Sequence, residues 1–300
     1  MITIFTPTYN RAHTLPRLYQ SLGRQTCTDF EWLVIDDGST DGTETLFTEW
    51  LRADNPFPIL YQKVENGGKD RAINAAMNLA HGEYFFIVDS DDLLCEDAVR
   101  TLLWGFSTLP QGDNSFIGIS VVRGDLTGKP IHQTPLIDPK IGYVDCNNLE
   151  RPLYNLQADM AECFFTDKLR KYEFPVWPGE KFTPEAVVWD QMALDGYRLR
   201  WFNRVEYLCE YQPDGLTNST WRLLRDNPMG YAMLFNHQLL HTSGLKARAN
   251  LVLQFLSCCF LAGEVGYVRK CNSIVLAALL LPAGWILSLR RMKQIATYCQ

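Results

Sequence analysis

The residues with the clearest chemical potential are three carboxylates within four positions, Asp89, Asp91 and Asp92. They directly follow Tyr84–Val88, an apolar run that predicts a buried strand. Carboxylates this close repel one another unless a cation or hydrogen bonds compensate them, and uncompensated charge costs most beside a buried strand. A divalent cation such as Mg²⁺ or Mn²⁺ prefers these oxygen ligands and commonly shares them with substrate phosphates. The cluster therefore favours a metal site over the alternative, a solvated turn that caps the next helix.

Polar clusters also follow the three preceding apolar runs, at Thr6–Arg11, Asp36–Ser39 and Asn66–Asp70. Asp, Asn, Gly and Ser are ordinary turn residues, so any one cluster has a purely structural explanation. Four consecutive strands that all end in polar residues indicate more, because ligands of an open parallel sheet bind outside the carboxyl ends of its strands. We therefore expect the four clusters to form one ligand site.

Short apolar strands alternating with amphipathic helices must position these clusters. This alternation predicts a parallel sheet with both faces covered. Beyond Phe116 the pattern is less regular and predicts two strands, Ile117–Val122 and Leu199–Tyr211, and one helix, Pro184–Asp195. Before it, the predicted strands are Ile2–Thr6, Glu31–Ile35, Ile59–Val64 and Tyr84–Val88, and the predicted helices are His13–Gln25, Asp41–Arg52 with Asp41 as its cap, Asp70–Ala80 and one from Glu96.

Composition disfavours several classes of protein. Hydrophobic residues make up 47% and charged residues 21% of the 300-residue chain, which is enough apolar material for a packed core. The net charge of −6 argues against a nucleic-acid partner, because phosphate neutralisation needs an excess of Lys and Arg. Nine cysteines without CxxC spacing favour a reducing compartment, and the first residues predict no signal peptide. No GxGxxG motif follows the first strand, and no P-loop or GxSxG elbow is present.

The C-terminal part of the chain differs from the rest in charge. Residues 243–300 carry seven Lys/Arg and one Glu, a net charge of +6, which leaves −12 on residues 1–242 because the whole chain carries −6. Ser273–Leu289 holds no charge over 17 positions, and Pro282 and Gly284 are predicted to kink it. Three alternatives stay open for this run: a helix packed on the body, an interfacial helix on anionic lipid, and a membrane span of borderline length.

The four polar clusters stand in motifs that resemble a known family. TPTYNRAHTL, VIDDGSTDGT, ENGGKDRAIN and FFIVDSDDLL follow one another within residues 1–110, and together they resemble the family 2 glycosyltransferases of the GT-A fold. A looser resemblance resumes at PEAVVWDQ and EYQPDGLTNS. The resemblance implies an α/β fold, with a Rossmann-like mixed sheet flanked by helices and here a helical C-terminal extension. It also implies a nucleotide-sugar donor, a divalent metal and inversion at the anomeric carbon.

The acid cluster matches the family's DxD motif. In the preferred register Asp89, Ser90 and Asp91 form the motif, and Asp92 leaves the register open by one residue. The resemblance implies that Asp91 is the favoured ligand of Mn²⁺ or Mg²⁺. Asp89 is the second candidate ligand, placed nearer the ribose or sugar.

The resemblance implies further contacts to the nucleotide. Asp37 matches the acid that holds the uracil ring. Ile73 stands where the family pattern NxGxxxARN has Arg, and Lys69 is the candidate replacement for a phosphate contact at that position. The other residues implied to contact the donor are Thr6, Pro7, Thr8, Tyr9, Arg11, Asn66, Gly68 and Asn74, with Ala72 completing the pattern.

A catalytic base is implied on a helix after the sheet, in an acidic motif that family members often carry as ED. Glu185 and Asp190 are the candidates here, and a five-residue spacing puts them about 140° apart around a helix. Both are therefore not expected to face one acceptor, and Glu185 is favoured. The alternative for Glu185 is a carboxylate that merely favours the start of the helix dipole.

Five other side chains have two explanations each. His237 and His241 have a spacing that suits zinc, but no HExxH motif completes the pair, so an ordinary helix face is favoured. Trp177, Trp189 and Trp201 offer rings either for sugar stacking or for core packing.

The sequence thus predicts an enzyme that moves a sugar from a nucleoside diphosphate, with a UDP-sugar favoured, to a hydroxyl of a glycan or lipid-linked glycan. The alternatives are a non-catalytic nucleotide-sugar-binding module and a sugar nucleotidyltransferase. The predicted domains are residues 1–225, with a nucleotide-binding half 1–110 and an acceptor half 111–225, and residues 226–300. We expect a cytoplasmic protein or one at the inner face of the membrane, with peripheral contact through residues 243–300.

Overall fold

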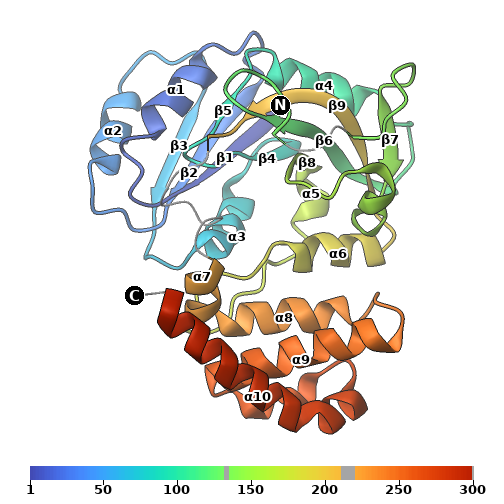
Figure 1. The fold of residues 1–300 in the computed structure, drawn as a ribbon. Helices are drawn as coiled ribbons and strands as arrows, with labels where there is room; N and C mark the ends of the chain where they lie inside the picture. The colour runs from blue at the N-terminus through green and yellow to red at the C-terminus, as the bar shows by residue number, and fades with distance from the viewer. Residues whose placement is uncertain (132–134, 211–219, 299–300) are drawn as a thin grey trace. The chain divides into compact units, whose positions relative to one another are not determined.

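The chain groups into two compact units. The computed structural model describes residues 1–131, 135–210 and 220–298 (Figure 1). The first unit comprises Met1–Glu173 and Met192–Gln212, and the second comprises Phe174–Gln191 and Pro213–Gln300. The four polar clusters of the sequence all belong to the first unit.

A nine-stranded sheet forms the centre of the first unit, in the order β3-β2-β1-β4-β8-β6-β9-β5, with β7 paired to β9 (Figure 1). The first four strands are parallel, and Ile4 of β1 lies opposite Trp32 of β2 and Phe86 of β4. Every residue of β1 and β2 is buried, which explains why both strands are rich in apolar residues. The bounds are β1 Ile2–Thr8, β2 Phe30–Asp36, β3 Ile59–Lys63 and β4 Tyr84–Ile87.

The other half of the sheet mixes directions. β8 pairs antiparallel with both β4 and β6, whereas β6 and β9 are parallel. β5 directly follows the acid cluster and, like β7, pairs antiparallel with β9. The predicted mixed sheet is confirmed. These strands are β5 Leu93–Leu94, β6 Phe116–Gly124, β7 Tyr143–Cys146, β8 Met160–Phe165 and β9 Arg198–Leu208.

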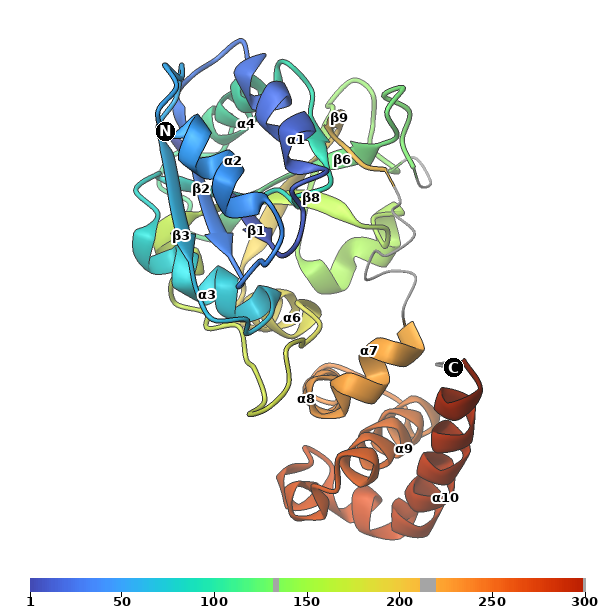
Figure 2. The same cartoon turned by 90° about the vertical axis from the view of Figure 1, so that its left-hand side faces the viewer.

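Helices cover both faces of this sheet (Figure 2). Helices α1, α2 and α4 contribute Leu18, Phe47 and Leu102 to a core cluster with Trp32, while α3 packs on β1 and β2 from the other face. The bounds are α1 Leu15–Gly23, α2 Thr43–Trp50, α3 Lys69–Leu79, α4 Ala98–Ser107, α5 Thr166–Leu169 and the 3-10 helix η1 Asn148–Tyr154.

The second unit is helical. Helix α6 begins in it and crosses the division at residue 191. Phe255, Leu256 and Cys259 of α9 lie at the centre of its core, together with Met229 of α8 and Ala277 of α10. The bounds are α6 Ala186–Leu194, α7 Thr220–Asp226, α8 Pro228–Gln238, α9 Leu245–Ala262, the 3-10 helix η3 Val265–Lys270 and α10 Ile274–Tyr298.

Two local predictions differ from the structure in detail, and a third is untested. The N-cap position of α2 is Gly42, while Asp41 accepts a hydrogen bond from the Thr43 amide at 3.0 Å. Pro282 lies inside α10, and the kink predicted there stays a prediction. The predicted strand at 199–211 corresponds to β9, which ends at Leu208, and its last residue lies outside the described residues. The domain boundary at residue 225 stays a prediction.

Candidate functional site

The loops after β1 and β2 are tied together by their own side chains. The Asn10 amide donates to Ser39 Oγ at 2.8 Å, and Asn10 Oδ1 accepts from the Thr40 amide at 2.8 Å. The Ala12 amide donates to Asp41 Oδ2 at 3.0 Å. The structure thus brings the first two polar clusters side by side, as the shared sheet edge predicts.

Asp37 joins the third cluster to the second. Its Oδ1 accepts from the Gly67 amide at 2.6 Å, and its Oδ2 accepts from the Gly68 amide at 2.8 Å. The Asn66 side-chain amide donates to the Asp37 backbone oxygen at 2.6 Å. Gly38 has φ +80°, and a Cβ there would lie 3.1 Å from the Asn66 amide nitrogen, so the turn requires glycine. Asp37 therefore holds the loop that begins α3.

The acid cluster is connected to the same loop by an ion pair. Lys69 Nζ, at the first position of α3, lies 2.9 Å from Asp89 Oδ1. Arg123 on β6 adds a second cation, with Nη1 at 3.8 Å from Asp89 Oδ2 and 3.9 Å from Asp92 Oδ2. Lys69, the predicted phosphate contact, therefore lies beside the acid cluster.

Tyr207 on β9 links two members of the cluster. Its hydroxyl donates to Asp92 Oδ2 at 2.7 Å and accepts from the Asp89 amide at 2.9 Å. The Arg123 guanidinium stacks over its ring at 4.4 Å. Sequence reasoning missed both Arg123 and Tyr207. The available signal was an arginine near the end of an otherwise apolar run at 116–124.

The three carboxylates differ in charge balance. Burial raises the pKa of Asp89, but attraction to Lys69 and Arg123 outweighs it, so the pKa lies below its usual value. Burial and repulsion from Asp89 raise the pKa of Asp91. The same two causes raise the pKa of Asp92 to about 7. The negative charges of Asp91 and Asp92 are therefore less compensated than that of Asp89. The oxygen donors present fit Mg²⁺ or Mn²⁺.

The residues of the first cluster have different surroundings. Thr6 is fully buried, and its hydroxyl accepts from Trp32 Nε1 at 3.0 Å, which indicates a supporting role. The buried Thr8 hydroxyl has no hydrogen-bond partner among the described residues. Tyr9 is 49% exposed, and the positive charge of Arg11 acts on Asp91. Thr8, Tyr9 and Arg11 thus differ in their surroundings from Thr6, and their contact with a ligand stays a prediction.

Helix α3 carries Ile73 at the position where the family pattern NxGxxxARN has arginine. Ile73 is fully buried on α3, in the core of the first unit, so a phosphate contact from this position is not available. Asn74 is half-buried on the same helix, and Pro7 is buried in β1. Ser90 is buried between the two acids of the motif.

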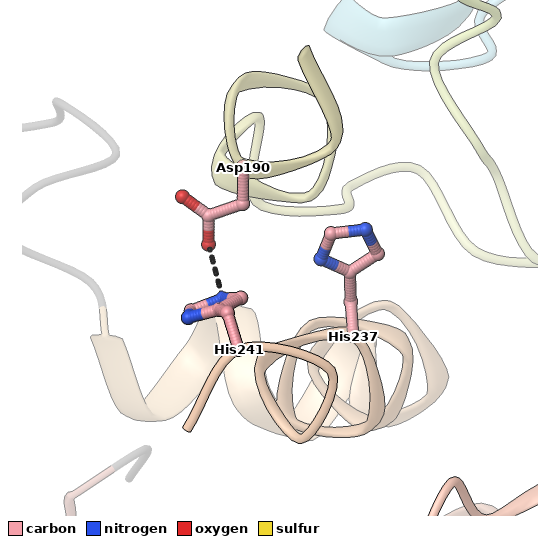
Figure 3. A group of neighbouring side chains, drawn as sticks. All are labelled: Asp190, His237 and His241. Carbon is pink, nitrogen blue, oxygen red and sulfur yellow. Dashed lines mark ion pairs between the residues drawn. The ribbon is translucent and has the colours of Figure 1, made fainter. Parts of the chain in front are cut away.

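The two candidate bases lie in the second unit. Glu185 is half-buried and directly precedes α6, where its carbonyl accepts from the Val188 amide at 2.9 Å. Asp190 is buried, and its Oδ2 lies 3.2 Å from His241 Nε2 (Figure 3). Asp190 thus forms a group with His237 and His241. The sequence analysis favoured an ordinary helix face for these two histidines.

Of the three candidate stacking rings, Trp201 belongs to the core. It is 1% exposed and donates from Nε1 to the Cys146 carbonyl at 2.9 Å. Trp189 packs edge-on against Phe174, and Trp177 packs in the same manner against Tyr267. These contacts favour the packing explanation.

Comparison with known proteins agrees with this geometry. The model of glycosyl transferase family 2 matches residues 3–146, the part of the chain that holds the four loops. TuaG of Bacillus subtilis strain 168, a glycosyltransferase whose name refers to teichuronic acid biosynthesis, is 30% identical over 224 residues, which cover 74% of this chain and 83% of TuaG. The chain therefore belongs to glycosyltransferase family 2.

Other relatives match over shorter stretches. The abequosyltransferase RfbV of Salmonella typhimurium strain LT2 is 34% identical over 51% of this chain and 46% of its own length. The glycosyltransferase GlyG of Streptococcus pneumoniae serotype 4 is 34% identical over 34% of each chain. The chain therefore spans between a third and a half of the length of these two relatives.

Solved structures share the fold over nearly the whole chain. Staphylococcus aureus TarS 1–349 in complex with UDP has a TM-score of 0.60 at 16% identity, covering 98% of this chain and 91% of that one. The mannosyltransferase PcManGT from Pyrobaculum calidifontis, in complex with GDP-Man and Mn²⁺, has a TM-score of 0.56 at 20% identity, covering 98% and 83%. The predicted GT-A fold is confirmed.

Proposed function

We propose that this protein transfers a sugar from a UDP-sugar to a hydroxyl of a glycan or lipid-linked glycan, with inversion and with Mn²⁺ or Mg²⁺. The observation that carries the proposal is the uneven charge balance of the acid cluster. Asp89 faces two cations, whereas burial and repulsion raise the pKa of Asp91. A divalent cation at Asp91 would relieve that repulsion and bind a diphosphate. Family membership supports the reaction class, and the named complexes of TarS and PcManGT support a nucleotide sugar and a metal.

The loop residues divide between the two ends of such a donor. Asp37 and Asn66 are the polar groups for the uracil ring. Tyr9 offers an exposed ring and directly follows Thr8, whose carbonyl accepts from the Asp37 amide at 2.8 Å. Arg11 and Lys69 supply positive charge for the diphosphate, because both act on the acid cluster. The metal, when bound, stabilises the negative charge that builds on the leaving diphosphate.

Inversion requires a carboxylate that takes the proton of the acceptor hydroxyl. Asp190 is close to His241, while Glu185 stands at the start of α6 outside that group. We therefore assign the base to Glu185. The PEAVVWDQ segment that carries both residues is where the looser sequence resemblance resumes.

A single substitution tests the metal assignment. We expect Asp91→Asn to lower UDP release from a UDP-sugar by about a hundredfold or more, because the metal ligand is lost. The thermal stabilisation by UDP with Mn²⁺ should disappear as well. Asp54→Asn, which changes an exposed acid of the same unit, is the matched control and should behave as the unaltered protein. Full activity in Asp91→Asn would refute the assignment.

The same assays separate the alternative functions. Glu185→Gln should keep donor binding and lose transfer. Binding of UDP-sugars without turnover in the unaltered protein, across a panel of donors and acceptors, would favour a non-catalytic module. Release of pyrophosphate from a nucleoside triphosphate and a sugar phosphate would favour a nucleotidyltransferase.

The second unit has an exposed apolar face that suits a membrane surface. Helices α9 and α10 are both long and apolar enough to cross a membrane by length and composition, a test that core helices also pass. One side of α10 packs on α9, and the other exposes Val275, Leu279 and Trp285, followed by the exposed Arg290 and Lys293. We infer that this face lies on anionic lipid at the cytoplasmic side of a membrane. A lipid-linked acceptor would be presented there.

A further inference from the structure

Three potential metal ligands converge in the second unit, away from the DxD motif in the chain. His237 lies at the end of α8, His241 follows it by one helical turn, and Asp190 belongs to α6 (Figure 3). One ligand atom from each residue lies within 4.8 Å of the other two. Asp190 Oδ2 and His241 Nε2 are 3.2 Å apart.

The surroundings favour an ordered arrangement of these side chains. Asp190 is 5% exposed, and the His241 side chain is 19% exposed. His237 Nε2 lies 3.0 Å from Gln191 Oε1, and donation to this oxygen would leave Nδ1 as the basic nitrogen of the ring. Metal-bound histidines characteristically donate their other ring N–H to an oxygen in this manner. Gln191 is therefore placed to orient the ring of His237.

The donor set distinguishes this group from the acid cluster of the first unit. Two imidazoles and one carboxylate suit Zn²⁺ or a similar transition metal, whereas the all-oxygen cluster suits Mg²⁺ or Mn²⁺. A tetrahedral zinc site has metal–ligand bonds of about 2.0–2.2 Å, which places its ligand atoms roughly 3.3 Å apart. The Asp190–His241 separation matches this spacing, and a ligand atom of His237 lies within 4.8 Å of both partners.

We propose that Asp190, His237 and His241 bind one Zn²⁺ ion, with a fourth position for water or another ligand. The site is separate in residues and in chemistry from the nucleotide-associated metal. The ion would connect Asp190 of α6 with His237 of α8, both in the second unit. Its main role would therefore be to fix α6, whose start carries the candidate base Glu185. A metal-free His–Asp pair is the competing explanation.

Metal binding by the full chain tests this proposal directly. After chelation, the protein is titrated with Co²⁺ and then Zn²⁺, and visible absorption reports the coordination. We expect one Co²⁺ per chain with the intense bands of a tetrahedral site, displaced by stoichiometric Zn²⁺. Zn²⁺ should also raise the melting temperature. His241→Gln should weaken Zn²⁺ binding by more than about a hundredfold, because even loss of an outer-shell partner costs about 10–100-fold.

Two control variants keep the test independent of folding and of the proposed sugar transfer. His13→Gln replaces an exposed histidine and should bind Zn²⁺ normally. Asp91→Asn should also bind Zn²⁺ normally, although its response to UDP and Mn²⁺ is lost. His237→Gln with an unchanged circular dichroism spectrum and unchanged Zn²⁺ affinity would overturn the proposal, as would octahedral or absent Co²⁺ bands in the unaltered protein.

Discussion

Asp89, Asp91 and Asp92 are neighbours in the chain but have unequal electrostatic surroundings. Two cations compensate Asp89, while Asp92 depends on the Tyr207 hydroxyl, whose hydrogen bond lowers its pKa against burial and repulsion. The consequence is a division of roles within four residues. Under the proposed function Asp91 attracts the cation, while the hydrogen bond from Tyr207 ties Asp92 to β9.

This anchor can be tested with Tyr207→Phe. We expect a loss of about 1–2 kcal/mol in the free energy of unfolding, because a buried carboxylate loses its hydrogen-bond donor. The pKa of Asp92 should rise further above its present value of about 7. Urea unfolding measures the first effect, and NMR titration of the carboxyl group measures the second. Tyr9→Phe, which removes an exposed hydroxyl, is the control. Equal unfolding midpoints for all three proteins would contradict the assigned role.

Residue-level prediction was possible where the chemistry is local in sequence. The four loops could be found because each one directly follows an apolar run. Arg123 and Tyr207 could not, because they reach the acid cluster through pairing of β6 and β9 with distant strands. Asp190 was likewise separated from the two histidines by more than 40 positions, so the spacing of the pair alone favoured a simple helix face.

Helices α9 and α10 approach each other closely at a single glycine. A Cβ at Gly284 would lie 2.5 Å from the Cβ of Leu256, which is shorter than any ordinary contact. Ala277 and Ser288 are buried along the same side of α10. Small side chains at these positions therefore explain how α10 packs on α9 while its larger apolar residues remain exposed.

Gly284→Ala tests this packing. We expect it to destabilise the second unit by about 1–3 kcal/mol through overpacking, although alanine has the higher helix propensity. Gly266→Ala is the control, because a Cβ there meets no atom within 4 Å. The double variant Gly284→Ala with Leu256→Ala should show a favourable coupling energy in thermal unfolding. A Gly284→Ala variant as stable as the unaltered protein would show that the helices can separate at no cost.

At the level of elements, the sequence predicts the four parallel strands β1 to β4, but it does not predict β5, β7 or β8. β1 to β4 were visible because β1, β2 and β4 are apolar and are each followed by polar loops. β5 has two residues and β7 has four, which is too short for a periodic signal. β8 lies in an irregular stretch, and its pairing with β4 and β6 is what defines it as a strand.

At the scale of the whole molecule, charge and exposed apolar surface are unevenly distributed along the chain. The acidic residues 1–242 contain the donor-site candidates, and the basic residues 243–300 contain the exposed face of α10. Under the proposed membrane contact, this distribution favours approach to anionic lipid through the basic residues 243–300.

Vesicle co-sedimentation tests the membrane contact. We expect the full chain to bind vesicles that contain phosphatidylglycerol, and to release as ionic strength rises. Leu279→Glu should weaken binding by at least about tenfold, because one apolar side chain no longer inserts. Leu245→Glu changes another exposed leucine of the second unit outside the α10 face and should leave binding unchanged. Equal binding to neutral and anionic vesicles would exclude the electrostatic part of the interaction.

The hydrogen bonds from the Gly67 and Gly68 amides to Asp37 have an effect beyond their own loop. Lys69, the next residue, forms an ion pair with Asp89, so residues 67–69 connect the second loop to the fourth. If a ligand at one of these loops changes affinity at the other, reciprocity requires an equal factor in the reverse direction. Uridine and pyrophosphate, added as separate fragments, would then each raise the affinity for the other. Neither fragment alone would bind as tightly as the intact nucleotide.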